Sequence, residues 1–213
     1  MLHRSRVRRA LRFAVLLSLF ASCHAPVAWG LDGRKLISQY VTHDWSIEHG
    51  LPDNNVQEVF QNKEGYLWLG TQKSGLVRFD GARFEPWPAD SGEPGDGVSV
   101  RALCETGDGS LWAGTEGSGL FRFQGKQRTR YGKSDGLPND QVRALHEDRA
   151  GVMWIGLNGR ALAQWNRKEF VVVPVPEDGP ASVVDFCEDR EGGMWLAGDG
   201  LWYFKDGEFT NLD

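Results

Sequence analysis

Short hydrophobic stretches, each bounded by Gly, Asp, Asn or Ser, run along the chain from residue 53 onward. In the first group of four, the pattern predicts strands at Val56–Gln61, Tyr66–Thr71, Leu76–Asp80 and Arg83–Trp87, with tight turns between them. No stretch keeps the spacing of an amphipathic helix. The pattern therefore predicts an all-β fold built from antiparallel hairpins.

One sequence pattern occurs four times in this part of the chain. The segment EGYLWLGTQKSGLVRFDG at 64–81 returns as DGSLWAGTEGSGLFRFQG at 108–125. Its tryptophan marks the four copies, which are separated by 44, 42 and 41 residues. A glycine lies three positions before each tryptophan, and an aromatic residue lies eleven positions after it, or nine in the fourth copy. These repeat positions are Trp68, Trp112, Trp154 and Trp195, Gly65, Gly109, Gly151 and Gly192, and Phe79, Phe123, Trp165 and Phe204.

A period of about 42 residues with four short strands is typical of a β-propeller blade. We predict four blades, at about residues 53–90, 97–131, 139–174 and 180–213. The chain has no Trp-Asp pair of the WD40 type, and a kelch repeat has a longer period. Because a tryptophan occupies the same place in every copy, we expect these side chains to pack between neighbouring blades rather than to stack on a ligand.

Additional motifs relate these copies to a known family. Gly50-Leu51-Pro52-Asp53-Asn54 precedes copy one, and Gly136-Leu137-Pro138-Asn139-Asp140 precedes copy three. Together with Leu67-Trp68-Leu69-Gly70-Thr71, these segments resemble the two-component regulator propeller repeat. The resemblance implies the periplasmic sensor region of a hybrid histidine kinase or a diguanylate cyclase, with seven-bladed propellers and a small-molecule ligand such as a carbohydrate breakdown product. Copies two and four lack the Gly-Leu-Pro segment, and copy three has Gly156-Leu157 in place of Gly-Thr.

The number of copies is too small for a complete ring of that kind. Seven blades need about 294 residues. Residues 38–45 match the outer strand of a blade, because Gln39–Thr42 precedes one Gly-Leu-Pro segment as Arg128–Tyr131 precedes the other. The fourth copy has its own outer strand at Glu208–Leu212, so the opening strand has no blade to join. We therefore expect an open, incomplete seven-bladed ring from a longer receptor, whose missing C-terminal blades and signalling domains are its expected partners and which could form a homodimer.

Residues 1–30 have the pattern of a secretory signal peptide. Five arginines precede the apolar run Phe13–Ala21, which is too short to span a bilayer, and Ala28-Trp29-Gly30 offers a cleavage site. Lipidation at Cys23 is a rival processing route, and Arg8-Arg9 is compatible with a twin-arginine signal. The expected location is the periplasm, or the periplasmic side of the inner membrane in a full-length receptor.

The charge balance argues against one class of partner. Residues 1–30 hold five of the 24 Lys and Arg residues and no acid, so the rest of the chain has 19 basic and 29 acidic residues. A net charge of −10 repels phosphate backbones, and we expect no nucleic-acid partner.

The sequence contains no recognisable catalytic constellation. It lacks a nucleophile elbow, a P-loop and an HExxH motif, so we expect no enzymatic activity, cofactor or metal. The acid pairs at 147–148 and 188–189 are interpreted as exposed turn carboxylates rather than calcium ligands. Trp87 and Trp202 fall outside the tryptophan register, and Trp87, close to the long connection Ala89–Gly97, is the candidate ligand platform.

The two cysteines of the repeat region share one repeat position. Cys104 and Cys187 lie eight residues before their tryptophan, where the other copies have Phe60 and His146. A position that accepts Cys, Phe and His is interpreted as a packing position, and His146 is not expected to bind a metal. A disulfide needs Cα atoms within about 7 Å, which copies separated by a whole blade do not provide.

Three functional hypotheses follow from the sequence. The first is a periplasmic ligand-sensing propeller module of a two-component-type receptor, without its kinase or cyclase part. The second is a stand-alone secreted propeller for protein interaction, and the third is a polysaccharide-active propeller enzyme, for which no residue is nominated.

Overall fold

The computed structural model describes residues 43–87 and 97–212. The predicted signal peptide, the outer strand at Gln39–Thr42 and nearly all of the connection Ala89–Gly97 lie outside the described residues. Among the described residues, no helix has the length and apolar character needed to cross a membrane.

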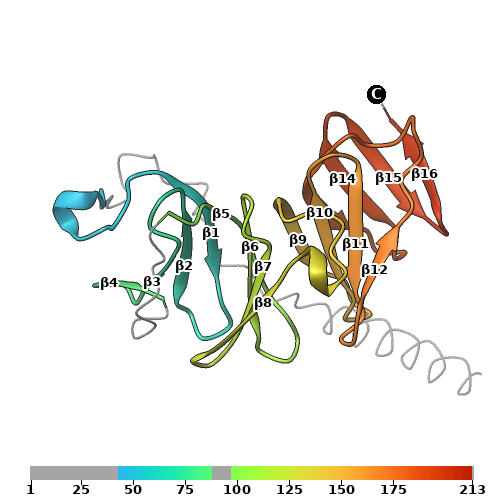
Figure 1. The fold of residues 1–213 in the computed structure, drawn as a ribbon. Helices are drawn as coiled ribbons and strands as arrows, with labels where there is room; N and C mark the ends of the chain where they lie inside the picture. Colours follow the sequence, from blue (N-terminus) through green and yellow to red (C-terminus); the bar gives the residue numbers. More distant parts are fainter. Residues whose placement is uncertain (1–42, 88–96, 213) are drawn as a thin grey trace, which may run out of the picture. The chain divides into compact units, whose positions relative to one another are not determined.

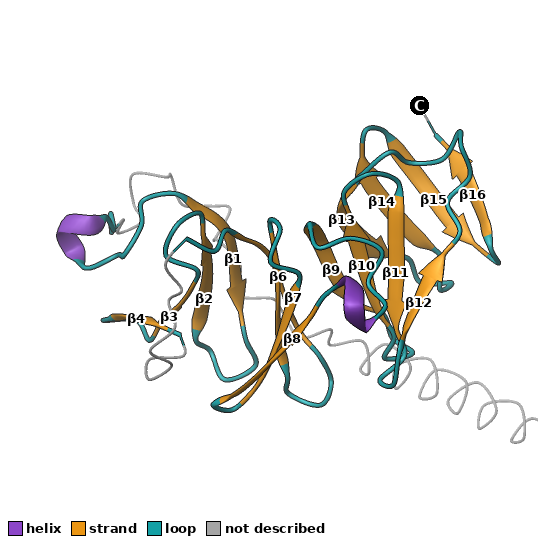
Figure 2. Cartoon of the chain, in the orientation of Figure 1, coloured by secondary structure: helices purple, strands orange, loops and turns teal. Residues whose placement is uncertain are grey.

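The described chain forms four antiparallel sheets of four strands, which we call blades one to four (Figures 1 and 2). Blade one consists of β1 (Val56–Gln61), β2 (Leu67–Thr71), β3 (Leu76–Phe79) and β4 (Phe84–Pro86). Blade two consists of β5 (Val100–Glu105), β6 (Leu111–Thr115), β7 (Leu120–Gln124) and β8 (Gln127–Tyr131). Blade three consists of β9 (Val142–Glu147), β10 (Met153–Leu157), β11 (Ala161–Trp165) and β12 (Phe170–Val173). Blade four consists of β13 (Val183–Glu188), β14 (Met194–Gly198), β15 (Leu201–Lys205) and β16 (Glu208–Asn211).

Each blade runs in sequence order from its first strand to its last. The first strands contact one another in succession, β1 with β5, β5 with β9 and β9 with β13, so they form the inner row of the propeller. Within the described residues no contact of similar extent joins β13 to β1. The prediction of an all-β, open arrangement of propeller blades is therefore confirmed.

The hydrophobic core is divided into three clusters, one between each pair of neighbouring blades. Trp68 packs with Leu111 and Phe123 of blade two, and Trp112 packs with Met153 and Trp165 of blade three. The third cluster, between blades three and four, contains Trp154, Met194 and Phe204. The repeated tryptophan thus projects from the second strand of one blade onto the second and third strands of the next.

A glycine two positions after each of these tryptophans allows the blades to approach closely. A Cβ atom on Gly70, Gly114 or Gly156 would lie within 2.5–2.9 Å of the first strand of the following blade. Real Cβ atoms do not tolerate such contacts, so glycine is the residue that fits. Blade four has Ala197 at this position, and its side chain is exposed.

The Gly-Leu-Pro segments have a structural explanation. Short 3₁₀ turns at Ile47–His49 and Lys133–Asp135 end at Gly50 and Gly136, whose φ angles are 91° and 100°. Only glycine adopts this left-handed conformation without strain. The leucine that follows is buried in both copies, so the turn anchors the entry to the blade in the core.

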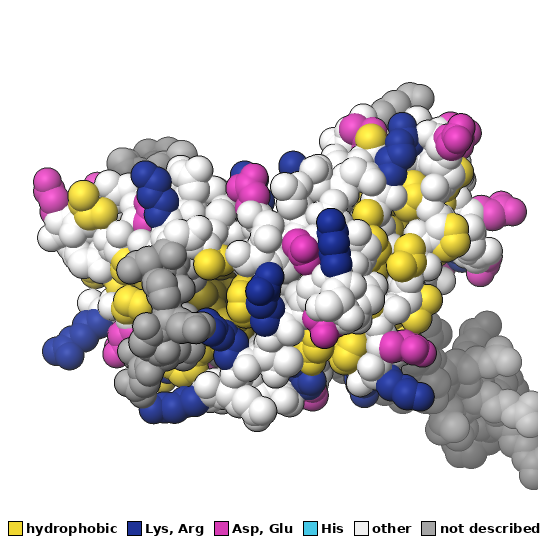
Figure 3. All heavy atoms as spheres, in the orientation of Figure 1, with side chains coloured by type: hydrophobic (Ala, Val, Ile, Leu, Met, Phe, Trp, Pro, Cys, Tyr) yellow, Lys and Arg dark blue, Asp and Glu magenta, His cyan; other side chains and the backbone are white. Residues whose placement is uncertain are grey.

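The outward faces of blades one and four are more exposed than the faces that pack between neighbouring blades. Val59 of blade one is 56% exposed, whereas its equivalent Leu103 in blade two is 6% exposed. Trp154 is buried, whereas Trp195 at the same place in blade four is only half-buried. Val184 and Leu201 of blade four are exposed as well. Figure 3 shows hydrophobic side chains at the surface over blades three and four.

Candidate functional site

Trp87, which falls outside the tryptophan register, has an equivalent residue in blade two. Trp87 follows the hairpin glycine Gly81 by six residues, as Tyr131 follows Gly125. Both residues lie at the end of the outermost strand of their blade, and both contact the repeated tryptophan of that blade. Tyr131 stacks on Trp112, and Trp87 meets Trp68 edge to face at 5.3 Å between ring centroids. The equal spacing from the hairpin glycine was the sequence signal that could have revealed this equivalence.

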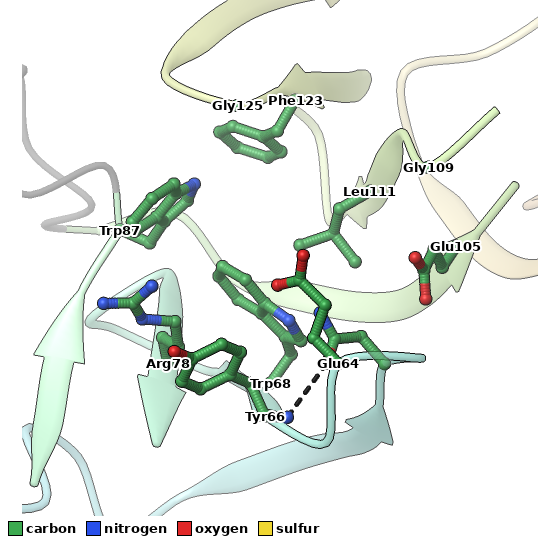
Figure 4. A pocket seen from close by; sticks show the side chains of 11 residues that line it. Glu64, Tyr66, Trp68, Arg78, Trp87, Glu105, Gly109, Leu111, Phe123 and Gly125 are labelled. Atoms are coloured by element: carbon green, nitrogen blue, oxygen red, sulfur yellow. Dashed lines mark hydrogen bonds between the residues drawn. The ribbon is translucent and has the colours of Figure 1, made fainter. Parts of the chain in front are cut away.

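Trp87 also lines a pocket between blades one and two, with a volume of about 240 Å³ (Figure 4). Blade one contributes Asn62, Glu64, Tyr66, Trp68, Arg78 and Trp87, and blade two contributes Glu105, Gly109, Leu111, Phe123 and Gly125. In Figure 4 the Trp68 ring forms the base of the pocket, with Tyr66 and Arg78 beside it and Phe123 facing it from blade two. This pocket is the candidate functional site.

At two lining positions of the pocket, blade two carries smaller residues than blade three. Between blades two and three, Trp165 and Arg167 line the cavity, which is only about 50 Å³. The equivalent residues facing blade one are Phe123 and Gly125, which line the larger pocket. A phenyl ring in place of an indole, and a glycine in place of an arginine, leave this space unfilled.

Three nitrogen atoms of the pocket residues are buried without a hydrogen-bond acceptor: Trp68 Nε1, Trp87 Nε1 and Arg78 Nε. The other inner tryptophans do have acceptors. Trp112 Nε1 donates to Thr106 Oγ1 at 3.1 Å, and Trp154 Nε1 donates to Asp148 Oδ2 at 2.9 Å. Buried donors without acceptors are rare and cost about 1–3 kcal/mol each.

The cause at Trp68 is the amide of Asn62, which stands where blade three has Asp148. Asp148 accepts one hydrogen bond on each carboxylate oxygen, from Val152 N and from Trp154 Nε1. The single oxygen of the Asn62 side chain already accepts from Tyr66 N at 2.9 Å. Its other terminal atom is a nitrogen, which cannot accept a hydrogen bond from Trp68.

This difference predicts opposite effects of two reciprocal substitutions. Asn62→Asp gives Trp68 an acceptor and is expected to raise the free energy of unfolding by about 1 kcal/mol. Asp148→Asn removes the acceptor from Trp154 and is expected to lower it by about 1–2 kcal/mol. Urea unfolding monitored by circular dichroism measures both, and equal shifts of one sign would contradict this explanation.

Arg78 is held between aromatic rings at one side of the pocket. Its guanidinium lies 4.8 Å from the Tyr66 ring centroid and 5.0 Å from that of Trp87. It also forms an ion pair with Glu85 of the neighbouring strand. Its charge is therefore balanced, and its position is fixed by stacking.

A recurring hydrogen bond joins each blade to the next. Lys63 N donates to Glu105 Oε2 at 2.9 Å, and Gly107 N donates to Glu147 Oε2 at 2.6 Å. Arg149 N donates in the same way to Glu188 Oε2 at 3.0 Å. In every case the donor is in the turn between the first two strands of one blade, and the acceptor ends the first strand of the next.

The acid pairs at 147–148 and 188–189 are therefore not simply exposed turn carboxylates. The side chains of Glu147 and Glu188 are 16% and 11% exposed, because each accepts the hydrogen bond from the preceding blade. Asp189 accepts a hydrogen bond from the Tyr203 hydroxyl, which lowers the pKa of its carboxyl. No group of His, Cys, Asp and Glu side chains suited to a metal ion occurs in the described part of the chain.

Cys104 and Cys187 are both free thiols. Cys104 is buried between blades, and this burial raises the pKa of its thiol to about 11. Cys187, at the same repeat position, is exposed because it lies on the outward face of blade four. His146 Nε2 is buried without a hydrogen-bond partner.

Asp108 makes a pH-dependent contribution to stability. Partial burial disfavours its charged form, but hydrogen bonds from Thr106 and Ser110 and the charge of Arg122 outweigh burial and lower the pKa to about 2. The folded-state pKa is below the ordinary value of 3.8, so this stabilisation is present above about pH 4 and is lost as the pH falls toward 2.

Asp108→Asn is expected to lower the free energy of unfolding by about 1 kcal/mol at neutral pH, a value reduced for solvent screening because the side chain is 45% exposed. As the pH falls through about 2, the difference in stability between the variant and the parent should shrink toward zero. Urea unfolding at several pH values tests this, and a difference that persists at low pH would contradict it.

Comparison with known proteins relates these blades to a family. Residues 50–73, 94–117 and 136–159 match the family model described as two component regulator propeller. These segments are two component regulator propeller repeats. Two of the propeller repeats begin at the Gly-Leu-Pro turn, and all three end in the turn after the second strand of a blade. Blade four, which has Ala197 in place of the close-contact glycine, is not among the matched segments.

Solved structures share the fold. The extracellular domain of a putative hybrid two component system from B. thetaiotaomicron is 22% identical, with a TM-score of 0.66 over 76% of this chain and 23% of that one. Virginiamycin B lyase from Staphylococcus aureus is 14% identical, with a TM-score of 0.58 over 76% of this chain and 56% of the lyase. The chain thus spans about a quarter and about half of these two structures. None of the curated proteins compared with the sequence matches it.

Proposed function

We propose that this chain is the periplasmic ligand-sensing propeller module of a two-component-type signal-transduction receptor. The observation that carries the proposal is the set of three two component regulator propeller repeats, which coincide with consecutive blades of the fold. The predicted signal peptide supports export. The extracellular domain of a hybrid two component system has the same fold, which is consistent with this role.

In this role the module binds and does not catalyse. The pocket between blades one and two has aromatic walls and hydrogen-bonding groups but presents no nucleophile paired with a base among its described lining residues. Ligand binding by such a module would be passed to a kinase or a cyclase on the other side of the membrane. The proposed receptor also contains further propeller blades and signalling domains.

The coding sequence downstream of Asp213 tests the receptor assignment. We expect further propeller blades, a membrane span and a kinase or cyclase domain in the same reading frame. A stop codon at that point, followed by an unrelated gene, would contradict it and favour a stand-alone secreted propeller. Fusion of residues 1–213 to a reporter that is active only outside the cytoplasm tests export separately.

A further inference from the structure

The interface between blades two and three carries a cation of its own. Arg167 Nη2 lies 3.9 Å from Glu147 Oε1, and both residues line the small cavity there together with Trp112 and Trp165. Glu147 Oε2 accepts the hydrogen bond from Gly107 N of the preceding blade, so one oxygen joins the blades and the other lies beside the guanidinium. Arg167 thus supplies a positive charge next to a carboxylate in a cavity lined by indole rings.

The interface between blades one and two keeps this carboxylate but not the arginine. Glu105 occupies the repeat position of Glu147, and its Oε2 accepts from Lys63 N. Gly125 occupies the repeat position of Arg167, because each follows the repeated aromatic residue of its blade by two positions. Glu105 and Gly125 both line the pocket. The space beside the carboxylate that a guanidinium takes in one interface is therefore part of the pocket in the other.

The charges of the two linings differ by one cation. The charged residues that line the cavity between blades two and three are two acids and two arginines, Asp108, Glu147, Arg122 and Arg167. The pocket between blades one and two is lined by the acids Glu64 and Glu105 but by only one arginine, Arg78. This arginine is already paired with Glu85. A lining with an excess of negative charge attracts a cation and repels an anion.

The walls of the pocket are suited to an organic cation. Its aromatic lining residues are Tyr66, Trp68, Trp87 and Phe123 (Figure 4). Aromatic rings attract guanidinium and ammonium groups through their electron-rich faces. Arg78 already shows this attraction, because its guanidinium lies 4.8 Å from the Tyr66 ring centroid and 5.0 Å from that of Trp87. The volume of about 240 Å³ limits the occupant to a small molecule or to one group of a larger one.

We propose that this pocket binds a small organic cation that carries one guanidinium or methylated ammonium group. The cation takes the place that Arg167 has in the next interface, beside the carboxylates of Glu64 and Glu105. Its apolar surface packs on the aromatic walls. This ligand class differs from the carbohydrate product that the family resemblance implies. The inference deepens the proposed ligand sensing and rests on it.

Titration of the full chain with matched cations and neutral molecules tests the proposal, followed through the NMR signals of the indole N–H groups at constant ionic strength. The probes are choline and N-methylguanidinium, and their uncharged counterparts of the same shape are 3,3-dimethylbutan-1-ol and N-methylurea. We expect at least one cation to bind about tenfold or more tighter than its counterpart, and the two cations distinguish the head groups. Absence of binding by both cations, or equal affinity for the neutral molecule, overturns the proposal.

One pair of variants tests the role of the pocket carboxylate. Glu64→Gln is expected to weaken binding of the cation about fivefold or more and to leave the neutral counterpart unaffected. Glu191→Gln is the matched control, because Glu191 has the same turn position in blade four, where it pairs with Lys205. This control should leave binding unchanged. Equal losses in the two variants would show that the net charge of the chain attracts the cation, and would overturn the assignment to this pocket.

A variant that supplies the cation from the chain itself completes the test. Gly125→Arg gives this interface the arginine of the next one, and Arg167 shows that the position accepts it, since the φ angles of Gly125 and Arg167 are 58° and 74°. The variant is expected to fold and to lose binding of the cation more than tenfold. Gly125→Asn, which tolerates the same backbone conformation without a charge, should bind within about threefold of the parent. Unchanged binding in Gly125→Arg, or an equal loss in Gly125→Asn, overturns the proposal.

The failure of this inference differs from failure of the proposed function. If the downstream coding sequence contains a membrane span and a kinase or cyclase while neither cation binds, the pocket assignment is wrong and the receptor assignment stands. If a cation binds as expected but the reading frame ends at Asp213, the pocket assignment stands and the receptor assignment is wrong.

Discussion

Trp112→Ala is expected to lower the free energy of unfolding by about 3–5 kcal/mol, the usual range for truncation of a buried tryptophan. The Trp112 side chain is 1% exposed and packs between blades two and three. Its ring stacks on Tyr131 and contacts Trp165, and its Nε1 donates to Thr106. Since small domains are stable by only about 5–15 kcal/mol, this one change would remove a large share of the stability.

The same change in blade four provides the matched control. Trp195 occupies the same repeat position, but it is half-buried and its described ring contact is with Tyr203 of its own blade. Trp195→Ala is expected to cost only about 1 kcal/mol. Urea unfolding followed by far-ultraviolet circular dichroism measures both, because this signal does not depend on the tryptophan removed. Equal losses would show that the outward face of blade four is covered in solution.

The strands and their order could be predicted from the sequence because each blade is a local structure. Successive strands pair through short turns, so the hydrophobic alternation and turn residues within about 40 residues contain the necessary information. In the first copy the sequence pattern predicts β1 with the bounds that the structure has, Val56–Gln61. It predicts β2 to begin one residue earlier than in the structure. The nearly constant spacing of the tryptophans indicates that they pack in the same layer, because residues at the same repeat position occupy the same place in every blade.

The contacts between blades could not be predicted in the same way. The hydrogen bond from Lys63 N to Glu105 joins residues 42 positions apart, and its donor is a backbone group that any residue supplies. A carboxylate at a turn therefore looked exposed. Only the neighbouring blade, placed by the structure, shows that Glu147 and Glu188 are acceptors with little exposure.

The candidate pocket was hidden for a related reason. Trp87 lies outside the tryptophan register, and its equivalence to Tyr131 follows only from the aromatic residue at the end of the outer strand. The pocket is lined by two smaller residues of blade two, Phe123 and Gly125, where blade three has Trp165 and Arg167. A sequence shows such differences, but it does not show which of them face each other across an interface.

Gly114→Ala is expected to lower the free energy of unfolding by about 2–3 kcal/mol, at the upper end for overpacking of a tight interface. The new Cβ would lie 2.5 Å from Val142 Cγ1 and 3.0 Å from Val142 Cβ, which belong to the first strand of blade three. Val142 is fully buried, so its side chain is surrounded by packed atoms. Blades two and three must therefore separate, which also loosens the packing of Trp112.

Two further variants decide whether this close approach is the cause. Ala197→Gly, at the same repeat position on the uncovered face of blade four, should change stability by less than about 1 kcal/mol. Val142→Ala in combination with Gly114→Ala should cost less than the sum of the two single changes, because the methyl groups that clash are gone. Additive losses in the double variant, or a loss at Ala197 equal to that at Gly114, would mean that backbone conformation and not the neighbouring blade requires glycine here.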